Sequence, residues 1–280
     1  MDYIELKCSI TNNCEEARDI LIAELGALGY ESFLESGEGV NAYIPENQFV
    51  KDGYNEIFCV TEKIFGTITF SYSLFKYKNW NEYWEKNFQP VTVIDKILIK
   101  APFHHVQDKF EFEIILKPKM SFGTGHHAST WLMLASMYEV DFNNKKVLDI
   151  GCGTGILSIF AEMKKAEYIL GFDNNDWAYH NAIENIELNN CSKVKILLGE
   201  ISDLQIENDF DVILANINRN VILEEMGKYI SKLKKGGEIL FSGILAENFS
   251  EINKMAIKNN LELKIKIDKD KWLALKYKLK

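Results

Sequence analysis

An unbroken alternation of helix-like and strand-like segments runs from residue 130 to the C-terminus, and it limits the fold of this 280-residue chain more than any other feature. Such alternation predicts a parallel sheet with helices on both faces. The last two strand-like segments are joined by only four residues, so they must pair antiparallel. We therefore predict an α/β fold with a Rossmann-like sheet that ends in an antiparallel hairpin. The predicted strands are 146–150, 168–172, 194–198, 211–215, 237–242, 261–267 and 272–278, and the predicted helices are 130–139, 155–164, 176–189, 221–233 and 249–258.

Residues 1–78 follow a different pattern and predict a separate small domain. Their strand and helix signals come in the order strand, helix, strand, strand, helix, strand, which is typical of a ferredoxin-like α+β fold. The segments are 3–10, 14–28, 31–34, 40–44, 46–63 and 67–75. A linker over 79–95 follows, with a short helix that ends before Pro90. The second domain then spans 96–280, and its first part holds two strand-like stretches, 97–101 and 111–116.

A glycine-rich turn joins the first strand of the alternating region to its helix. The strand runs into Gly151-Cys152-Gly153-Thr154-Gly155, and the next strand ends in Asp173. A strand, a glycine turn, a helix and a strand with an acid at its tip bind an adenosine-bearing cofactor, with the acid on the ribose hydroxyls. The dinucleotide fingerprint needs a small residue where Ile156 stands. The pattern therefore favours S-adenosylmethionine, with Gly151 and Gly153 against its methionine and ribose portions; a purely structural tight turn is the alternative.

Asn216 ends the predicted strand 211–215, at the edge where open α/β sheets bind ligands. Its side-chain carbonyl is suited to accept a hydrogen bond from a substrate amine and so direct the nitrogen lone pair at a methyl group. The alternative is that Asn216 caps the following helix. Asn218 and Asn220 are better placed for capping, which leaves Asn216 as a candidate catalytic residue.

A second glycine turn, Phe122-Gly123-Thr124-Gly125-His126-His127, precedes the helix at 130. It lacks the Gly-Lys-Ser/Thr of a phosphate-binding loop, and its position beside the cofactor turn indicates a lid. We predict that Gly123, Thr124, Gly125 and His126 contribute to the cofactor site and that Phe122 stacks on the alkylammonium product. No nearby acid or cysteine completes a metal site around the histidines, so no metal is expected. A role for them as a general base or as pocket lining stays open.

Composition limits the partners and the compartment. The chain carries a net charge of −9, which argues against nucleic acid as its main partner. Residues 1–78 hold 13 acidic and 6 basic residues, a balance that suits either a basic protein partner or ordinary solubility. The five cysteines are odd in number and form no Cys-x-x-Cys pair, and neither a signal peptide nor an apolar run of 18 residues is visible. We expect a cytoplasmic monomer with reduced thiols and no membrane association.

Taken together, these motifs resemble those of the PrmA-type ribosomal protein methyltransferases, which modify the stalk-base protein L11 of the bacterial large subunit. The resemblance covers nearly the whole chain, and the Phe-Gly-Thr-Gly-His block is its most specific part. The matching blocks are Asn79–Trp84, Phe88–Pro90, Lys117–Thr130, Asp149–Gly155, Gly171–Asp173, Ala215–Ile217 and Ser242–Leu245. The resemblance implies a Rossmann-like methyltransferase fold, Thr130, Gly151, Asp173 and Asn216 as cofactor-binding positions, and recognition of L11 by the acidic N-terminal domain.

Three positions depart from the family pattern. Lys117 stands where an acid is usual, Asn175-Asp176 replaces Asp-Pro, and Asn218 stands where an apolar residue is common. The first two lie beside the core motifs. Asn218 is expected to line the target pocket, so it bears on substrate preference.

The expected reaction is methyl transfer from S-adenosylmethionine to protein amines, which must be neutral to react. Neutralising a lysine of pKa about 10.4 at pH 7 costs roughly 4–5 kcal/mol, against about 1 kcal/mol for an α-amine. Burial beside the sulfonium lowers the pKa of the amine further, so no strong base is needed. The resemblance implies trimethylation of the α-amine and of lysines; the residues themselves fix neither site nor multiplicity.

Three alternatives remain at this stage. The chain could methylate another protein or a small amine, or it could be a cofactor-binding module without turnover, which the intact Asn216 and Thr130 disfavour. A nicotinamide-dependent dehydrogenase is disfavoured by Ile156 and by the terminal hairpin.

Overall fold

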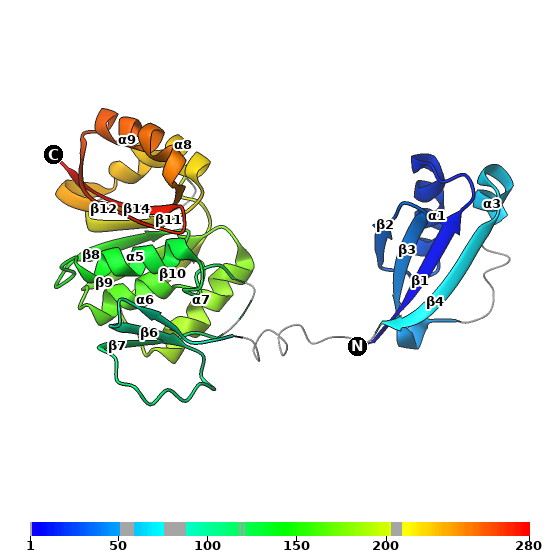
Figure 1. Cartoon of the computed structure of the whole chain (residues 1–280), viewed down its shortest axis with the longest axis horizontal. Helices are drawn as coiled ribbons and strands as arrows, with labels where there is room; N and C mark the ends of the chain where they lie inside the picture. The colour runs from blue at the N-terminus through cyan, green and yellow to red at the C-terminus, as the bar shows by residue number, and fades with distance from the viewer. Residues whose placement is uncertain (1, 51–58, 76–87, 118, 120, 203–208) are drawn as a thin grey trace. The chain divides into compact units, whose positions relative to one another are not determined.

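A computed structural model describes residues 2–50, 59–75, 88–117, 119, 121–202 and 209–280. The chain divides into two compact units, Met1–Tyr83 and Trp84–Lys280 (Figure 1), and each is described by itself below. The linker helix predicted over 79–88 lies outside the described residues except for its last residue.

The first unit has a four-stranded antiparallel sheet in the order β2-β3-β1-β4. With helices after the first and third strands, this is the strand order of a ferredoxin-like domain, as predicted. One predicted helix, 46–63, is confirmed only in its last part: helix covers Cys59–Phe65, whereas Glu46–Gln48 form a single 3₁₀ turn followed by extended backbone at Phe49. The elements are β1 (Tyr3–Ile10), α1 (Glu15–Ala27), β2 (Ser32–Glu35), β3 (Gly39–Pro45), η1 (Glu46–Gln48), α3 (Cys59–Phe65) and β4 (Ile68–Phe75).

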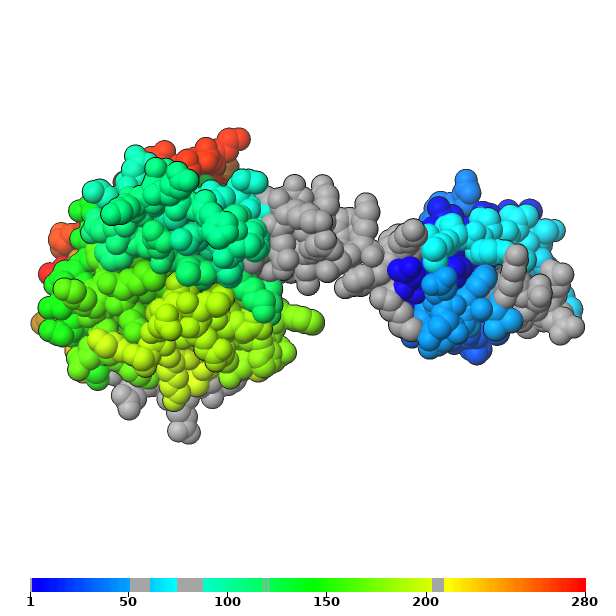
Figure 2. Space-filling view, turned by 90° about the horizontal axis from the view of Figure 1, so that it is seen from below, coloured from blue at the N-terminus to red at the C-terminus, as the bar shows by residue number. Residues whose placement is uncertain are grey.

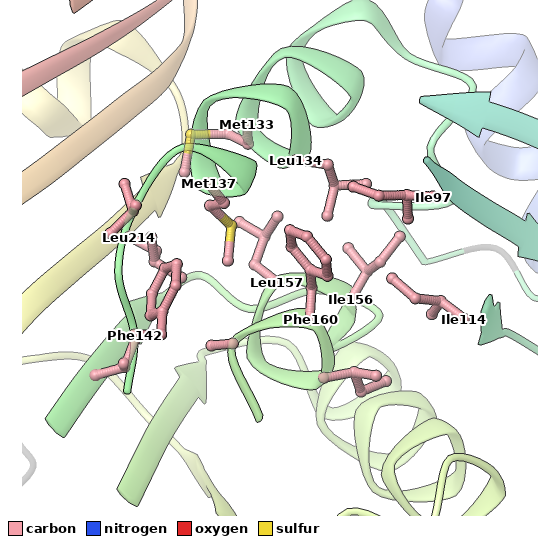
Figure 3. Packing of buried hydrophobic residues seen from close by; sticks show 14 of the residues in the cluster. Ile97, Ile114, Met133, Leu134, Met137, Phe142, Ile156, Leu157, Phe160 and Leu214 are labelled. Atoms are coloured by element: carbon pink, nitrogen blue, oxygen red, sulfur yellow. The ribbon is translucent and has the colours of Figure 1, made fainter. Parts of the chain in front are cut away.

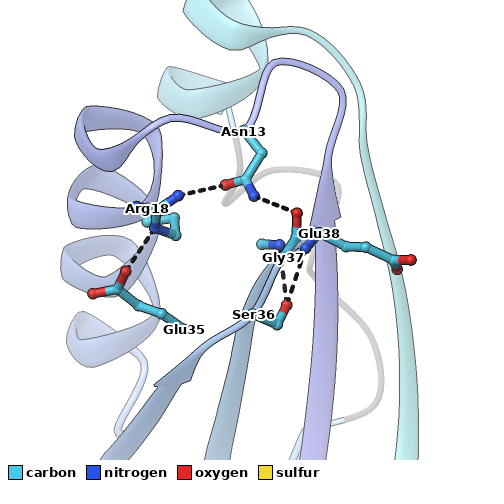
Figure 4. Close-up of polar contacts among 7 residues, drawn as sticks. Asn13, Arg18, Glu35, Ser36, Gly37 and Glu38 are labelled. Carbon is cyan, nitrogen blue, oxygen red and sulfur yellow. Dashed lines mark hydrogen bonds and ion pairs between the residues drawn. The ribbon is translucent and has the colours of Figure 1, made fainter.

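A polar network ties the start of α1 to the β2–β3 turn (Figure 4). The Arg18 guanidinium lies 2.8 Å from the Glu35 carboxylate and donates to the Asn13 side chain, and Asn13 in turn donates to the carbonyl of Gly37. The Ser36 hydroxyl accepts the Gly39 amide across the turn. These bonds fix a helix N-terminus that has no side-chain cap of its own.

The second unit is built on a seven-stranded sheet in the order β10-β9-β8-β11-β12-β14-β13. The first five strands are parallel, and β14 pairs antiparallel with both β12 and β13. The predicted fold class is therefore confirmed, including the terminal hairpin. The strands are β8 (Lys146–Ile150), β9 (Tyr168–Asp173), β10 (Val194–Leu198), β11 (Phe210–Asn216), β12 (Leu233–Leu245), β13 (Leu261–Lys269) and β14 (Trp272–Leu279).

Five helices of the described residues cover this sheet, and the core lies between them and the strands. They are α5 (Ala128–Tyr138), α6 (Ile156–Met163), α7 (Asp176–Leu188), α8 (Arg219–Ile230) and α9 (Phe249–Lys258), with a 3₁₀ turn η2 (Ala246–Asn248) before α9. Figure 3 shows Met133 and Met137 of α5 and Leu157 and Phe160 of α6 packed around one apolar centre. Their burial holds both helices, and therefore the glycine turns that precede them, in fixed positions.

A small sheet of β5 (Val91–Val93), β6 (Ile97–Lys100) and β7 (Phe112–Ile115) precedes α5. Only β6 and β7 were expected, because three residues after a proline carry little strand signal. On one face of the unit this segment and α7 lie side by side (Figure 2). Asn189 exchanges hydrogen bonds with the backbone of Ile115, and Asn185 accepts the Lys117 amide. These hydrogen bonds fix the end of β7, a few residues before the turn at Phe122, against the C-terminal part of α7.

Lys164 closes the C-terminal end of α5 from the neighbouring helix. Its ammonium donates to the carbonyls of Met137, Tyr138 and Val140, and burial lowers its pKa. The Met137 carbonyl also accepts the Val140 amide (3.0 Å), and the cation adds a donor to the carbonyls that end α5 and follow it. We expect Lys164→Met to lower the free energy of unfolding by about 2–3 kcal/mol. Denaturant unfolding would measure this, with the exposed Lys165→Met as control; equal stability of the two variants would contradict the assigned role.

Candidate functional site

The two glycine turns are joined by direct hydrogen bonds. The Thr154 amide donates to the carbonyl of Phe122 (3.0 Å), and the Thr154 hydroxyl donates to the carbonyl of Gly123 (2.7 Å). A Cβ at Gly153 would lie 2.4 Å from the Phe122 oxygen, and φ there is +55°. Only glycine allows this approach without strain. The structure thus brings together the two turns that the sequence left 26 residues apart.

Asp173 lies at the end of β9 with its carboxylate against the cofactor turn. One oxygen accepts the Gly153 amide (2.9 Å) and the other accepts the Asn175 amide (3.0 Å). A carboxylate oxygen has room for a further hydrogen bond. Both oxygens can therefore also accept from a ribose diol, and a carboxylate placed beside the Gly151–Gly155 turn fits S-adenosylmethionine.

Asp149, at the end of β8, is fully buried beneath the same turn. Burial raises the pKa of its carboxyl to about 7, opposed by a hydrogen bond from the Ser158 hydroxyl (2.7 Å). Its second oxygen, Oδ1, has no partner among the described residues. The acid is therefore held between its neutral and charged forms near neutral pH.

This raised pKa predicts a pH-dependent stability. Because the folded pKa of about 7 lies above the ordinary 3.8, the stability that Asp149 contributes is complete below pH 4 and is lost as pH rises through 7. Asp149→Asn removes this loss. We expect the variant to gain about 2–3 kcal/mol relative to the unsubstituted protein between pH 5 and pH 8. Urea unfolding at the two pH values would measure it; parallel pH profiles would contradict it.

Asn216 ends β11, and its side chain is oriented by Thr130 of α5. The Asn216 amide nitrogen donates to the Thr130 hydroxyl (3.2 Å), while its carbonyl oxygen is buried and has no partner among the described residues. Asn216 does not cap α8. That role falls to Asn218, whose side chain accepts the Asn220 amide, as the sequence indicated. The result is a fixed carboxamide with a free acceptor.

A cavity of about 480 Å³ opens in front of Asn216. One wall is aromatic: the Phe122 and His127 rings lie 5.2 Å apart, and His127 meets Trp272 edge-to-face at 4.6 Å. Phe122 is 54% exposed, an unusual state for a large apolar ring. Trp272 is a wall residue that the sequence did not indicate, because only the fold of the C-terminal hairpin brings it here. The available signal was a tryptophan directly after a tight turn.

Gly125 and His126 of the second glycine turn contact residues that precede the turn in the chain. His126 meets the Thr124 hydroxyl through Nδ1 and the Gln89 carbonyl through Nε2, both at 3.1 Å, and its ring packs against Phe88. A Cβ at Gly125 would lie 2.3 Å from the Ile99 side chain. Neither residue lines the cavity in front of Asn216, and their cofactor contacts stay predictions. His127 caps α5 by accepting the Ser129 amide.

Two departures from the family pattern have clear structural roles. Lys117 pairs with Glu184 of α7 (3.2 Å), as does Lys119 (2.6 Å), so a base at 117 has an acid opposite it. Asn175 caps α7 by accepting the Ala178 amide, which replaces the helix-starting role of proline.

No helix within the described ranges is both long and apolar enough to span a membrane.

Comparison with known proteins assigns the chain. The sequence profile described as ribosomal protein L11 methyltransferase (PrmA) matches residues 3–280. The ribosomal protein L11 methyltransferase of Bacteroides fragilis is 37% identical over all of both chains, and that of Porphyromonas gingivalis is 37% identical over 99% of this chain and 98% of its own. The crystal structure of a ribosomal protein L11 methylase from Lactobacillus delbrueckii subsp. bulgaricus superposes with a TM-score of 0.64 at 25% identity, covering 69% of this chain and 100% of its own. The chain therefore belongs to the ribosomal protein L11 methyltransferase (PrmA) family.

Proposed function

We propose that this protein transfers methyl groups from S-adenosylmethionine to amines of ribosomal protein L11, and that the acceptor amine enters the cavity in front of Asn216. The observation that carries the site is the Asn216 carboxamide, whose nitrogen donates to Thr130 and whose buried oxygen has no partner in the part of the chain that the structure describes. An unsatisfied buried acceptor costs free energy, and an amine N–H would satisfy it.

S-adenosylmethionine, when bound, supplies a methyl group that its sulfonium makes electrophilic. The protein then has to orient the amine and exclude water. Asn216 accepts from the neutral amine and fixes the direction of its lone pair. Phe122 and Trp272 offer ring faces to the growing positive charge of the methylated nitrogen.

The lining of the cavity also favours a neutral amine. Its only charged side chain among the described residues is Arg219, which Glu251 neutralises from outside the cavity. Without a carboxylate to stabilise an ammonium, the pKa of an entering lysine falls. We propose that the targets are the α-amine and lysine ε-amines, with up to three methyl groups on each. We also propose that the protein is a monomer and that its N-terminal domain recognises L11.

Intact-mass and peptide mapping of L11 after incubation with the protein and S-adenosylmethionine tests this assignment. The expected products carry one, two and three methyl groups on individual amines. Modification confined to side chains other than amines would refute the proposed acceptor, and a mass increase that stops at one methyl group would refute the multiplicity alone.

A further inference from the structure

Four asparagines gather at the cavity in front of Asn216. Besides Asn216 itself, they are Asn218, Asn220 and Asn248, and no aspartate, glutamate or lysine lines the cavity among the described residues. Asn218 is the position at which the family pattern usually has an apolar side chain. We call Asn218, Asn220 and Asn248 the amide rim.

The rim amides are oriented by the fold. The Asn218 carbonyl caps α8 by accepting the Asn220 amide (3.1 Å), and the Asn220 side-chain carbonyl accepts from the Arg219 guanidinium (2.7 Å). Arg219 is fixed in turn by Glu251. Each of these two carboxamides therefore has its oxygen engaged, while its NH₂ group forms no hydrogen bond with a described residue.

Asn248 of the η2 turn is the third member of the rim. It precedes α9, yet its side chain caps nothing and makes no hydrogen bond with a described residue. It is half-buried and lines the cavity, and neither its donor nor its acceptor is engaged by a described residue. A side chain that could cap a helix but does not is available for a ligand.

We propose that the amide rim binds the main chain that adjoins the acceptor amine, so that the protein reads the backbone of its substrate rather than the neighbouring side chains. The inference rests on the proposed function. Carboxamides donate and accept in the same geometry as peptide groups, and they carry no charge to select a flanking residue. The occupant is an extended peptide segment of the acceptor protein. A site that binds the main chain can accept amines whose neighbouring residues differ.

The test uses a lysine of L11 that peptide mapping has shown to be methylated. The residue next to this lysine is replaced by alanine or by proline. Alanine there removes the side chain, whereas proline removes the N–H and restricts the backbone. We expect alanine to change kcat/KM less than about twofold and proline to lower it about fivefold or more, as for one lost hydrogen bond. A main-chain ester at the same bond is the second variant if proline unfolds L11.

The same two L11 substrates are then tested with the enzyme variant Asn218→Ser/Asn248→Ala. Serine at 218 keeps the helix cap but lacks the NH₂ group. This variant should lower kcat/KM for L11 about 20-fold and keep cofactor affinity within twofold. With it, the loss of kcat/KM caused by proline or by the ester in L11 should fall to less than about twofold. Asn143→Ala, at the opposite edge of the sheet, is the control and should leave activity unchanged.

An alanine effect as large as the proline effect, or an undiminished proline and ester penalty in the double variant, would overturn backbone reading. If the unsubstituted protein does not methylate L11 at all, the proposed function fails first and this inference fails with it.

Discussion

Asn216→Ala is expected to lower the rate of methyl transfer to L11 about 100- to 1000-fold with cofactor at saturation. The variant removes the buried Asn216 oxygen, which has no partner among the described residues, from a side chain that lines the cavity. Loss of such a contact leaves the amine free to rotate, and a misplacement of about 1 Å at a reacting centre costs on the order of 100-fold. Single-turnover transfer, with both substrates saturating, would measure the effect on the chemical step.

Thr130→Val is the matched control for this prediction. It keeps the Asn216 oxygen but removes the hydroxyl that holds the amide nitrogen at 3.2 Å. We expect a loss of about tenfold, because one neutral hydrogen bond orients the carboxamide. If Asn216→Ala transfers methyl groups within threefold of the unsubstituted protein, the acceptor amine is not oriented by this residue.

Asp173→Ala is expected to weaken S-adenosylmethionine binding by a factor of about 100 or more. The carboxylate is the one group at this turn suited to accept from both ribose hydroxyls, and hydrogen bonds to a charged group are worth about 1.5–3 kcal/mol each. The change also releases the Gly153 and Asn175 amides, so part of the loss comes from a looser turn. Calorimetric titration with the cofactor would measure the affinity.

Asp173→Asn should be nearly as damaging as the alanine variant. Because each carboxylate oxygen already accepts a backbone amide, the NH₂ group of asparagine must face one of these donors. Asp176→Ala changes an exposed acid three residues later and should leave affinity within twofold. Retained affinity in Asp173→Asn would contradict the ribose contact.

Most of the catalytic fold could be predicted, because its strands are short apolar runs bounded by polar residues or glycine. The strand predicted over 146–150 has those bounds in the structure. The strand predicted from residue 237 starts earlier in the structure, at Leu233. The Lys234–Gly236 segment has the local sequence of a turn, but pairing with β11, with a shift in register, extends the strand through it. Long-range pairing of this kind overrides local propensity.

The site was predictable where its residues follow strand ends. Gly151, Asp173 and Asn216 lie at the carboxyl ends of neighbouring parallel strands, so the topology alone brings them to one edge. The sequence did not indicate Trp272 or Asn248 as wall residues, because each depends on how the terminal hairpin and the η2 turn fold back over that edge. The orientation of the His126 side chain could not be predicted from the local sequence either, because it depends on a hydrogen bond to the carbonyl of Gln89, 37 residues earlier in the chain.

The most direct test of the account is the intact mass of purified L11 after incubation with this protein and S-adenosylmethionine. We predict a mass increase in steps of one methyl group that requires the cofactor and that forms about 100-fold or more slowly with Asn216→Ala. Unchanged L11 mass in the presence of protein that binds S-adenosylmethionine tightly would contradict the account, because a folded, cofactor-loaded site would then lack the proposed activity.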